Sequence, residues 1–324
     1  MEAICGILGR RDADALDAMI AALRARKEAT HKDIAENYAV AASHPLDGLC
    51  LLDGAPRVKT IANLSPNLFH RYCAESSRSS SLDIKGPFAS AVGLDSGARW
   101  WLMRDRLGQR PLYYFHGNGF LAFASELKAL LASSLVPKRL NLLAVDRYLT
   151  LRCVPGAESI VAGVYRVQPG HVLEYKDGHI SETRIATFDL QPHEQPRESA
   201  ASTLRDLLAA SLDRETPESV LWSAGIDCAA LAALRDELKP VYVSLDRTWQ
   251  DESRLAAESA RMMGLSLQTL HARRLTEETV HKAVRALDEP LADPSILPFW
   301  LIAEAASEKA TTYVSGHGAD ELLG

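Results

Sequence analysis

The sequence lacks the features that would tie it to a membrane or to nucleic acid. The most apolar late stretch, Ser295 to Ala306, is interrupted by Glu304 and is too short to span a bilayer. The chain does not open with a basic segment followed by an apolar one, as a secretory signal does. Its net charge is -6, whereas nucleic-acid binders usually present a basic face. We therefore expect neither a membrane nor a nucleic-acid partner.

Cysteine is scarce and scattered. The five cysteines are Cys5, Cys50, Cys73, Cys153 and Cys228, an odd number with no CxxC pair. This usage excludes a zinc ribbon and a disulfide framework, and it is typical of a reducing compartment. We expect a cytoplasmic protein.

The chain is long enough for two domains, with 324 residues of which 47% are hydrophobic. Its first half has many short strand-like runs, such as Ile4–Leu8, Phe88–Leu94 and Phe120–Ala124, which predict a sandwich covered by helices. The proline-containing polar stretch Gln191–Ser199 reads as a linker. We place one domain at 1–190 and a second at 199–324.

The second half alternates strands with helices. Val220–Trp222, Val241–Leu245 and Thr312–Ser315 have the apolar composition of buried strands. Alternation of this kind predicts an α/β domain with a mostly parallel sheet, in which ligands bind beyond the carboxyl ends of the strands.

LWSAGIDCAAL, residues 221–231, is a strand end, a small-residue turn and a helix start. A helix N-terminus binds phosphate readily, and small residues let the backbone approach an anion closely. Asp227 would repel phosphates unless it held Mg²⁺. From these residues alone, a plain turn with a first-turn acid is the favoured alternative.

The last residues repeat the pattern. TYVSGHGADELLG, residues 312–324, again runs from an apolar strand into a small-residue turn followed by acids. Asp227 and Asp320 would then share a Mg²⁺ that bridges the phosphates of ATP. Between the two turns lies LDEPLADPS, residues 287–295, for which a solvated acidic loop is the competing interpretation.

These motifs resemble the asparagine synthetase family, in which a class II glutamine amidotransferase domain precedes an ATP-pyrophosphatase domain. The family's SGGxDS loop matches 223–228, its SGEGADE signature matches 315–321, and DEPxADPS matches 288–295. In the first half, ICGILG (4–9), RDRLGQRPLYY (104–114), FASELKAL (123–130) and RVQPGHVLEY (166–175) are similar to family segments in the same order.

The resemblance implies an Ntn-type α+β sandwich followed by a parallel-sheet domain. It also implies a two-step ligase reaction: ATP adenylates a small-molecule or peptide carboxylate with release of pyrophosphate, and ammonia, from glutamine or free, or another amine then displaces AMP. The implied cofactors are ATP and Mg²⁺, with Asp227 and Asp320 as metal ligands and with Asp227, Asp320, His317 and Cys5 as the candidate catalytic residues. The implied ATP and pyrophosphate contacts are Leu221, Ser223, Ala224, Gly225, Ile226, Asp227, Cys228, Ser244, Ser315 and Gly316.

The first half departs from the family. Cys5 stands where the nucleophile would be, but Met1 to Ile4 precede it. Without cleavage after Ile4, its amino group lies in a peptide bond and cannot act as the base. A buried structural cysteine is the preferred interpretation. The family's HRGPD segment has at best a weak counterpart at Ala25–Asp33, and no NGEIYN-like segment supplies an oxyanion hole. We expect glutamine hydrolysis to be weak or absent.

The second half departs as well. Ala224 replaces a glycine, which would cost about 1 kcal/mol if the position needs a positive φ. Cys228 replaces a serine, and at a helix N-terminus it would be oxidisable. His317 replaces the glutamate of asparagine synthetases and resembles the GHG of lasso-peptide macrolactam synthetases.

The sequence stops at Gly324, where the family continues into helices that carry a catalytic lysine. Three explanations are open. The sequence is a fragment, its site is completed by a partner chain or by a homodimer, or the protein is not a competent synthetase. The rivals to an amide ligase of the asparagine synthetase type are a peptide macrolactam ligase and a non-catalytic nucleotide-binding or scaffold protein.

Overall fold

The computed structural model describes residues 3–23, 31–42, 50–54, 57–58, 73, 84–186, 194–245 and 252–323. The chain divides into two compact units. The first comprises Met1–Leu190 with Leu287–Ala292, and the second comprises Gln191–Ala286 with Asp293–Gly324. Part of the expected linker (191–193), most of the HRGPD counterpart (25–30) and Gly324 lie outside the described residues. Among the helices described, none has the length and apolar character needed to cross a membrane.

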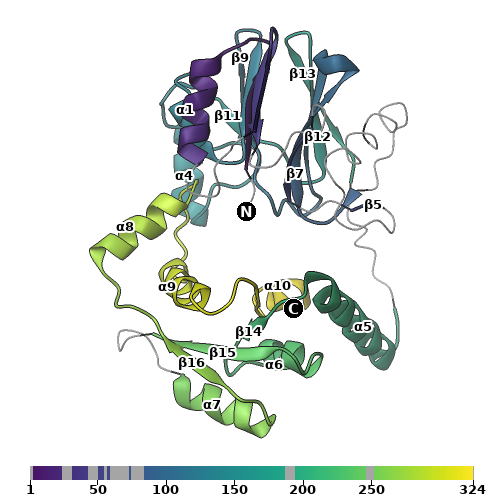
Figure 1. Cartoon of the computed structure of the whole chain (residues 1–324), viewed down its shortest axis with the longest axis vertical. Coiled ribbons are helices and arrows are strands. Elements are labelled where there is room, and N and C mark those ends of the chain that lie inside the picture. Colours follow the sequence, from purple (N-terminus) through teal and green to yellow (C-terminus); the bar gives the residue numbers. More distant parts are fainter. Residues whose placement is uncertain are drawn as a thin grey trace. The chain divides into compact units, whose positions relative to one another are not determined.

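The first unit is built on two antiparallel sheets, which Figure 1 shows face to face. One has the order β11-β9-β10-β1-β3-β2 and the other β13-β12-β8-β7-β4. Their strands are β1 (Ile4–Leu8), β2 (His31–Ala35), β3 (Tyr38–Ala42), β4 (Cys50–Gly54), β7 (Phe88–Leu94), β8 (Arg99–Arg104), β9 (Tyr113–Gly117), β10 (Phe120–Ala124), β11 (Val164–Arg166), β12 (His171–Lys176) and β13 (His179–Arg184), and a separate small ribbon joins β5 (Arg57–Val58) to β6 (Ile84–Lys85). The helices are α1 (Ala13–Leu23), α3 (Leu127–Ala132) and α4 (Leu142–Leu151), with a 3-10 turn at Asp95–Gly97.

Alternation along β1 explains the layers of this unit. Ile4 and Leu8 enter the core between the two sheets, while Cys5 and Ile7 enter a second core beneath α1 and α3. Gly6 faces the inter-sheet core, where an added Cβ would stand 2.7 Å from the ring of Phe123. The strand is therefore buried on both faces, as its continuous apolar run predicts.

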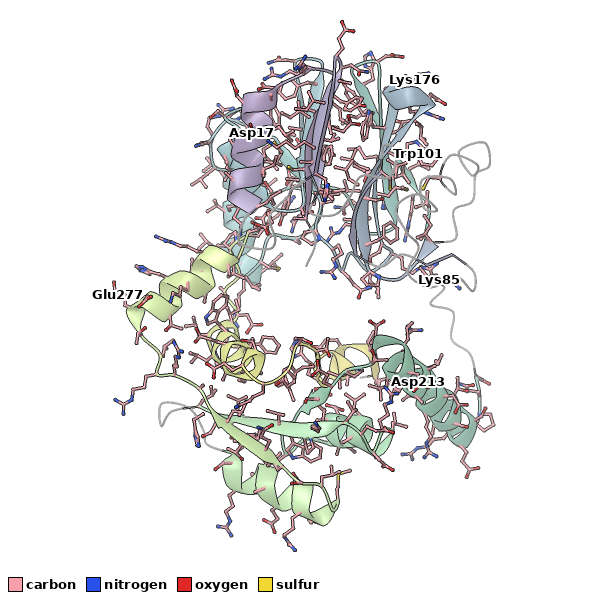
Figure 2. The ribbon with its side chains drawn as sticks, viewed as in Figure 1. Asp17, Lys85, Trp101, Lys176, Asp213 and Glu277 are labelled. Atoms are coloured by element: carbon pink, nitrogen blue, oxygen red, sulfur yellow. The ribbon has the colours of Figure 1, made fainter. Side chains whose placement is uncertain are left out.

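The outer face of the second sheet carries a third core. Trp101 of β8, labelled in Figure 2, is buried there, and its indole N–H donates to Glu174 Oε2 at 2.7 Å. A buried indole normally finds such an acceptor, so this tryptophan is part of the fold.

The RDRLGQR segment also builds the fold. Asp105 is buried, and its carboxylate accepts backbone N–H groups from Phe88, Leu107, Gln109 and Arg110 at 3.0–3.3 Å. Arg104 beside it donates to the backbone carbonyls of Gly108 and Arg110 in the same turn and to that of Val167. Both charged side chains thus fix the turn that leads into β9.

The second unit contains a parallel sheet of order β16-β15-β14-β17. Its elements are α5 (Arg197–Glu215), β14 (Ser219–Leu221), α6 (Ile226–Ala233), β15 (Lys239–Ser244), α7 (Ser253–Met262), β16 (Gln268–His271), α8 (Glu277–Ala286), α9 (Ile296–Ser307), β17 (Tyr313–Val314) and α10 (Ala319–Leu323). Within this unit, α9 lies on one side of the sheet and α6 and α7 on the other (Figure 1). Near the C-terminal end of α5, Asp213 forms an ion pair in which its Oδ1 lies 3.3 Å from Nη2 of Arg235 (Figure 2 labels Asp213). The predicted fold class, a sandwich followed by a parallel-sheet α/β domain, is confirmed.

Six residues from the second half of the sequence belong to the first unit. In this segment, Leu287–Ala292, Glu289 Oε2 accepts the N–H of Ile160 at 3.1 Å, and Ala292 N–H donates to the carbonyl of Arg152 at 2.8 Å. Burial raises the pKa of Glu289, although the N–H of Ile160 opposes the shift. Asp288 and Glu289 are therefore half-buried, whereas residues 291–295 are exposed, so the solvated-loop interpretation holds only for the later part of the loop.

Candidate functional site

The two Ser-Gly turns leave the same edge of the parallel sheet. Strands β14 and β17 are adjacent and parallel, with Ser219 opposite Tyr313 and Val220 opposite Val314. Because each turn follows the carboxyl end of its strand, both open on the side where parallel sheets bind ligands.

Direct contact joins the two turns. A Cβ built on Gly316 would stand 2.5 Å from Asp227 Cβ and 3.1 Å from the backbone nitrogen of Cys228. Gly316 has no left-handed φ, so the site needs glycine here for close approach rather than for backbone freedom.

A cavity of about 430 Å³ lies at this edge. The predicted site residues that line it come from both turns: Leu221, Ser223, Asp227, Cys228, Ser315, Gly316, His317 and Asp320. Acids and apolar side chains share the lining of this cavity.

Other predicted residues lie outside the lining. Ala224, Gly225 and Ile226 are exposed at the tip of the first turn. Ser244 is half-buried, and its carbonyl accepts the N–H of Ala272 at 2.9 Å, while the following Leu245 does line the cavity. At this strand end Leu245, and not Ser244, borders the cavity, and the contact with ATP stays a prediction.

The thiol of Cys228 closes the first turn. Its Sγ lies 3.2 Å from the carbonyls of Ser223 and Gly225 and 3.3 Å from the N–H of Ser223. The residue is only 2% exposed, although it borders the cavity, and the expected oxidation of its thiol stays a prediction. Ala224 has no positive φ, so the condition for backbone strain at that residue is not met.

The start of α6 suits an anion. Gly225 is the N-cap, and no side chain caps the helix. The backbone N–H groups of the first turn of a helix have no partner within it and carry a partial positive charge. They are free to meet phosphate oxygens.

The acids of the two turns suit a hard cation. Asp227 is half-buried in the first turn of α6, and Asp320 is exposed in the first turn of α10. Within the described ranges, no group of three or more His, Cys, Asp or Glu side chains is arranged to hold a metal. One or two carboxylates completed by substrate phosphates is the usual environment of protein-bound Mg²⁺. Asp227 and Asp320 both line the cavity, so the residue types that such a site uses are present, and their sharing of one cation stays a prediction.

Sequence reasoning missed part of the lining. Glu252 and Glu321 add two further carboxylates, and Phe299 and Ile302 of α9 form an apolar wall. The stretch Asp251-Glu252-Ser253 resembles a segment of the asparagine synthetase family, so the sequence held a signal for Glu252, although Asp251 lies outside the described residues. Phe299 and Ile302 lie in an apolar helical segment. Its sequence pattern is that of a helix buried in a core, so the sequence does not distinguish a cavity lining from core packing.

Cys5, the candidate nucleophile, lies in the first unit. It is 0% exposed in the middle of β1, opposite Ala124 on one side and Ala41 on the other. Burial raises the pKa of its thiol, with a small opposing effect of Lys32. A buried neutral thiol in a strand is a poor nucleophile.

Comparison with known proteins agrees with this division of the chain. A glutamine amidotransferase domain model matches residues 68–196, and an asparagine synthase model matches residues 199–324. These two matches, together with the relatives below, support an asparagine synthetase-family protein.

Individual relatives are distant. Asparagine synthetase [glutamine-hydrolyzing] 1 of Bacillus subtilis is 27% identical over 251 residues, covering 74% of this chain and 40% of the relative. Amidase chry2 of Gibberella zeae is 24% identical over 274 residues, with coverage of 74% and 40%. The chain thus spans about 40% of the length of these curated relatives.

A solved glutamine phosphoribosylpyrophosphate amidotransferase of B. subtilis, complexed with ADP and GMP, aligns over 90% of this chain and 72% of its own. Its sequence identity is 11% and its TM-score is 0.35, too distant a likeness to support an argument.

Proposed function

We propose that the second unit binds Mg²⁺-ATP in the cavity and uses it to activate a carboxylate for amide formation. The observation that carries this is the contact between the two turns: Gly316 abuts Asp227, and both turns line one cavity at the carboxyl edge of the sheet. Relatives named as asparagine synthetases support the same chemistry.

The first turn would hold the pyrophosphate part of ATP. The N–H groups at the start of α6 donate to phosphate oxygens, and the small side chain of Ser223 and the lack of one at Gly225 let the phosphates approach the backbone. Asp227 and Asp320 would hold Mg²⁺, which neutralises the phosphates and makes pyrophosphate a better leaving group.

The reaction proceeds in two displacements. A carboxylate oxygen of the substrate attacks the α-phosphorus, and the bond from that phosphorus to the pyrophosphate oxygen breaks. An amine nitrogen then attacks the acyl carbon, the C–O bond to AMP breaks, and the nitrogen loses a proton to form the amide. The contribution of the chain is to orient both reactants and to stabilise the departing phosphate charge.

We propose that free ammonia or another amine is the nitrogen source, because Cys5 is buried and its pKa is raised. Under this proposal the chain releases no glutamate from glutamine, and the Cys5→Ala variant behaves like the wild type in the same assay. Glutamate formation that disappears in Cys5→Ala would overturn this part while leaving the ATP site untouched.

Titration calorimetry of the full chain with ATP, with and without Mg²⁺, tests the nucleotide site. We expect Mg²⁺-dependent binding that weakens at least about tenfold in Asp227→Asn and in Asp320→Asn, because each removes a charged ligand worth more than ~1.4 kcal/mol. Asp236→Asn is the matched control, since this exposed acid of the same unit lies outside the lining.

Pyrophosphate release with aspartate or with a peptide acid then tests the chemistry. Wild-type protein that binds no Mg²⁺-ATP, or Asp227→Asn protein that binds it unchanged, would contradict the proposal and favour a non-catalytic protein.

A further inference from the structure

One wall of the cavity is formed by side chains without polar atoms, which cannot act as ligands of a phosphate or a metal. Phe299 and Ile302 lie three residues apart on α9, which puts them on the same face of the helix, and both line the cavity. The Phe299 side chain is 49% exposed, although α9 is one of the most apolar segments of the chain. An aromatic ring left open to a ligand cavity is available for contact with a substrate.

The ring of His317 packs against this wall. Its centroid lies 6.1 Å from that of Phe299, with the planes inclined by 43°. His317 directly follows Gly316, the residue in contact with Asp227. The Phe299–His317 pair therefore joins the apolar wall to the turn where the phosphates and the reacting group would meet.

The other large aromatic side chains of the described lining are committed to the core. Trp222 is 4% exposed, and its indole N–H donates to the carbonyl of Ala256 at 3.0 Å and lies 3.2 Å from Ser259 Oγ. Tyr242 is buried in the same core. These two rings are buried beneath the cavity, whereas the ring of Phe299 is exposed to a ligand bound in it.

We propose that Phe299, backed by His317 and Ile302, selects a substrate that carries an aromatic or similarly flat apolar group beside its reacting carboxylate or amine. The proposal deepens the ligase function and rests on it, because the wall borders the site where the two reactants would be joined. Small polar reactants such as acetate-like acids or ammonia-like amines would leave this wall in contact with water.

Two matched pairs of probes test the proposal on the full chain by saturation-transfer NMR, with and without Mg²⁺-ATP. The acid arm compares hippurate with N-acetylglycine, which share a carboxylate and differ in a phenyl ring. The amine arm compares benzylamine with methylamine. We expect the aromatic member of at least one pair to bind about fivefold more tightly, the ratio typical of a ring–ring contact.

Substitutions in the apolar wall test whether it causes the preference for the aromatic probe. Phe299→Ala should reduce the preference to less than about twofold, and Phe299→Leu should retain part of it, because leucine keeps apolar area without a ring. Ile302→Ala gives a second, milder change if Phe299→Ala does not fold. Leu255→Ala is the control, since Leu255 is an exposed apolar side chain (56%) on α7, outside the lining.

Equal binding within both pairs, or a preference that survives in Phe299→Ala, overturns the inference. It is also overturned if Phe299→Ala weakens only Mg²⁺-ATP, because the ring would then stack on the adenine. Wild-type protein that shows the probe preference but no ATP binding contradicts the ligase proposal alone, so the two failures are distinguishable.

Discussion

Replacing Gly316 by alanine inserts a methyl group between the two turns of the cavity. The new Cβ would lie 2.5 Å from Asp227 Cβ, and ordinary contact begins at 3.4 Å. The turns must therefore move apart by about 0.9 Å. The opposing atoms are a side-chain stem and the backbone nitrogen of Cys228, neither of which can swing aside as a flexible chain end could.

The size of the effect follows from that displacement. Overpacking of this kind usually lowers the free energy of unfolding by about 1–3 kcal/mol. A shift near 1 Å in a positioning group can lower a reaction rate by about two orders of magnitude. We expect Gly316→Ala to lose stability in urea unfolding and to lose at least about tenfold in Mg²⁺-ATP affinity by calorimetry.

Gly318→Ala is the matched control, because it separates backbone strain from crowding. Gly318 has a φ of +98° and no atom within 4 Å of the position an added Cβ would take. Its replacement should cost about 1–2 kcal/mol of stability through the left-handed backbone, while leaving Asp227 in place. The reasoning is refuted if Gly316→Ala keeps wild-type affinity, or if both variants lose affinity equally at equal stability.

Three further outcomes follow from the first unit. Asp105→Asn should lower the free energy of unfolding by about 2–3 kcal/mol, because an amide cannot replace a carboxylate that accepts four N–H groups; an unchanged urea midpoint would contradict this. Burial raises the pKa of Glu289, so the wild type should lose stability relative to Glu289→Gln as the pH rises from about 4.3 through the raised folded-state pKa. Below about pH 4.3 the difference should no longer change with pH, and urea titrations at several pH values measure it. Iodoacetamide should label the half-buried Cys153 of the folded protein before the buried Cys5, as mass spectrometry can measure. Equal labelling rates for the two cysteines would contradict this.

Strands with continuous apolar runs were predictable from sequence. Ile4–Leu8, Phe88–Leu94 and Phe120–Ala124 match β1, β7 and β10 at both ends, because all three are buried on both faces. The edge strand β16 (Gln268–His271) was missed, since an exposed edge needs little apolar surface and its sequence shows almost none. Helix α5 was missed for a related reason. Leu212 is the one residue of this helix that is buried, so the apolar residues show little helical periodicity.

The candidate site was predictable turn by turn but not as a whole. Each Ser-Gly turn follows an apolar strand in the sequence, which local patterns reveal. The pairing of β14 with β17 joins residues more than ninety positions apart, and no local pattern specifies that neighbour. The contact of Gly316 with Asp227 follows only from this pairing, and the contribution of Phe299 follows only from the packing of α9 against the sheet.

The charges of the cavity tie nucleotide binding to metal binding. Four carboxylates line it, those of Asp227, Glu252, Asp320 and Glu321. A phosphate oxygen about 4 Å from one of these acids is repelled by roughly 1–4 kcal/mol in a partly solvated site. The start of α6 offers only about half a positive charge in return, so a polyphosphate needs a cation that the same acids attract. Tight ATP binding without a divalent cation would therefore be harder to reconcile with this cavity than an absence of binding, because the acids would then face the phosphates directly.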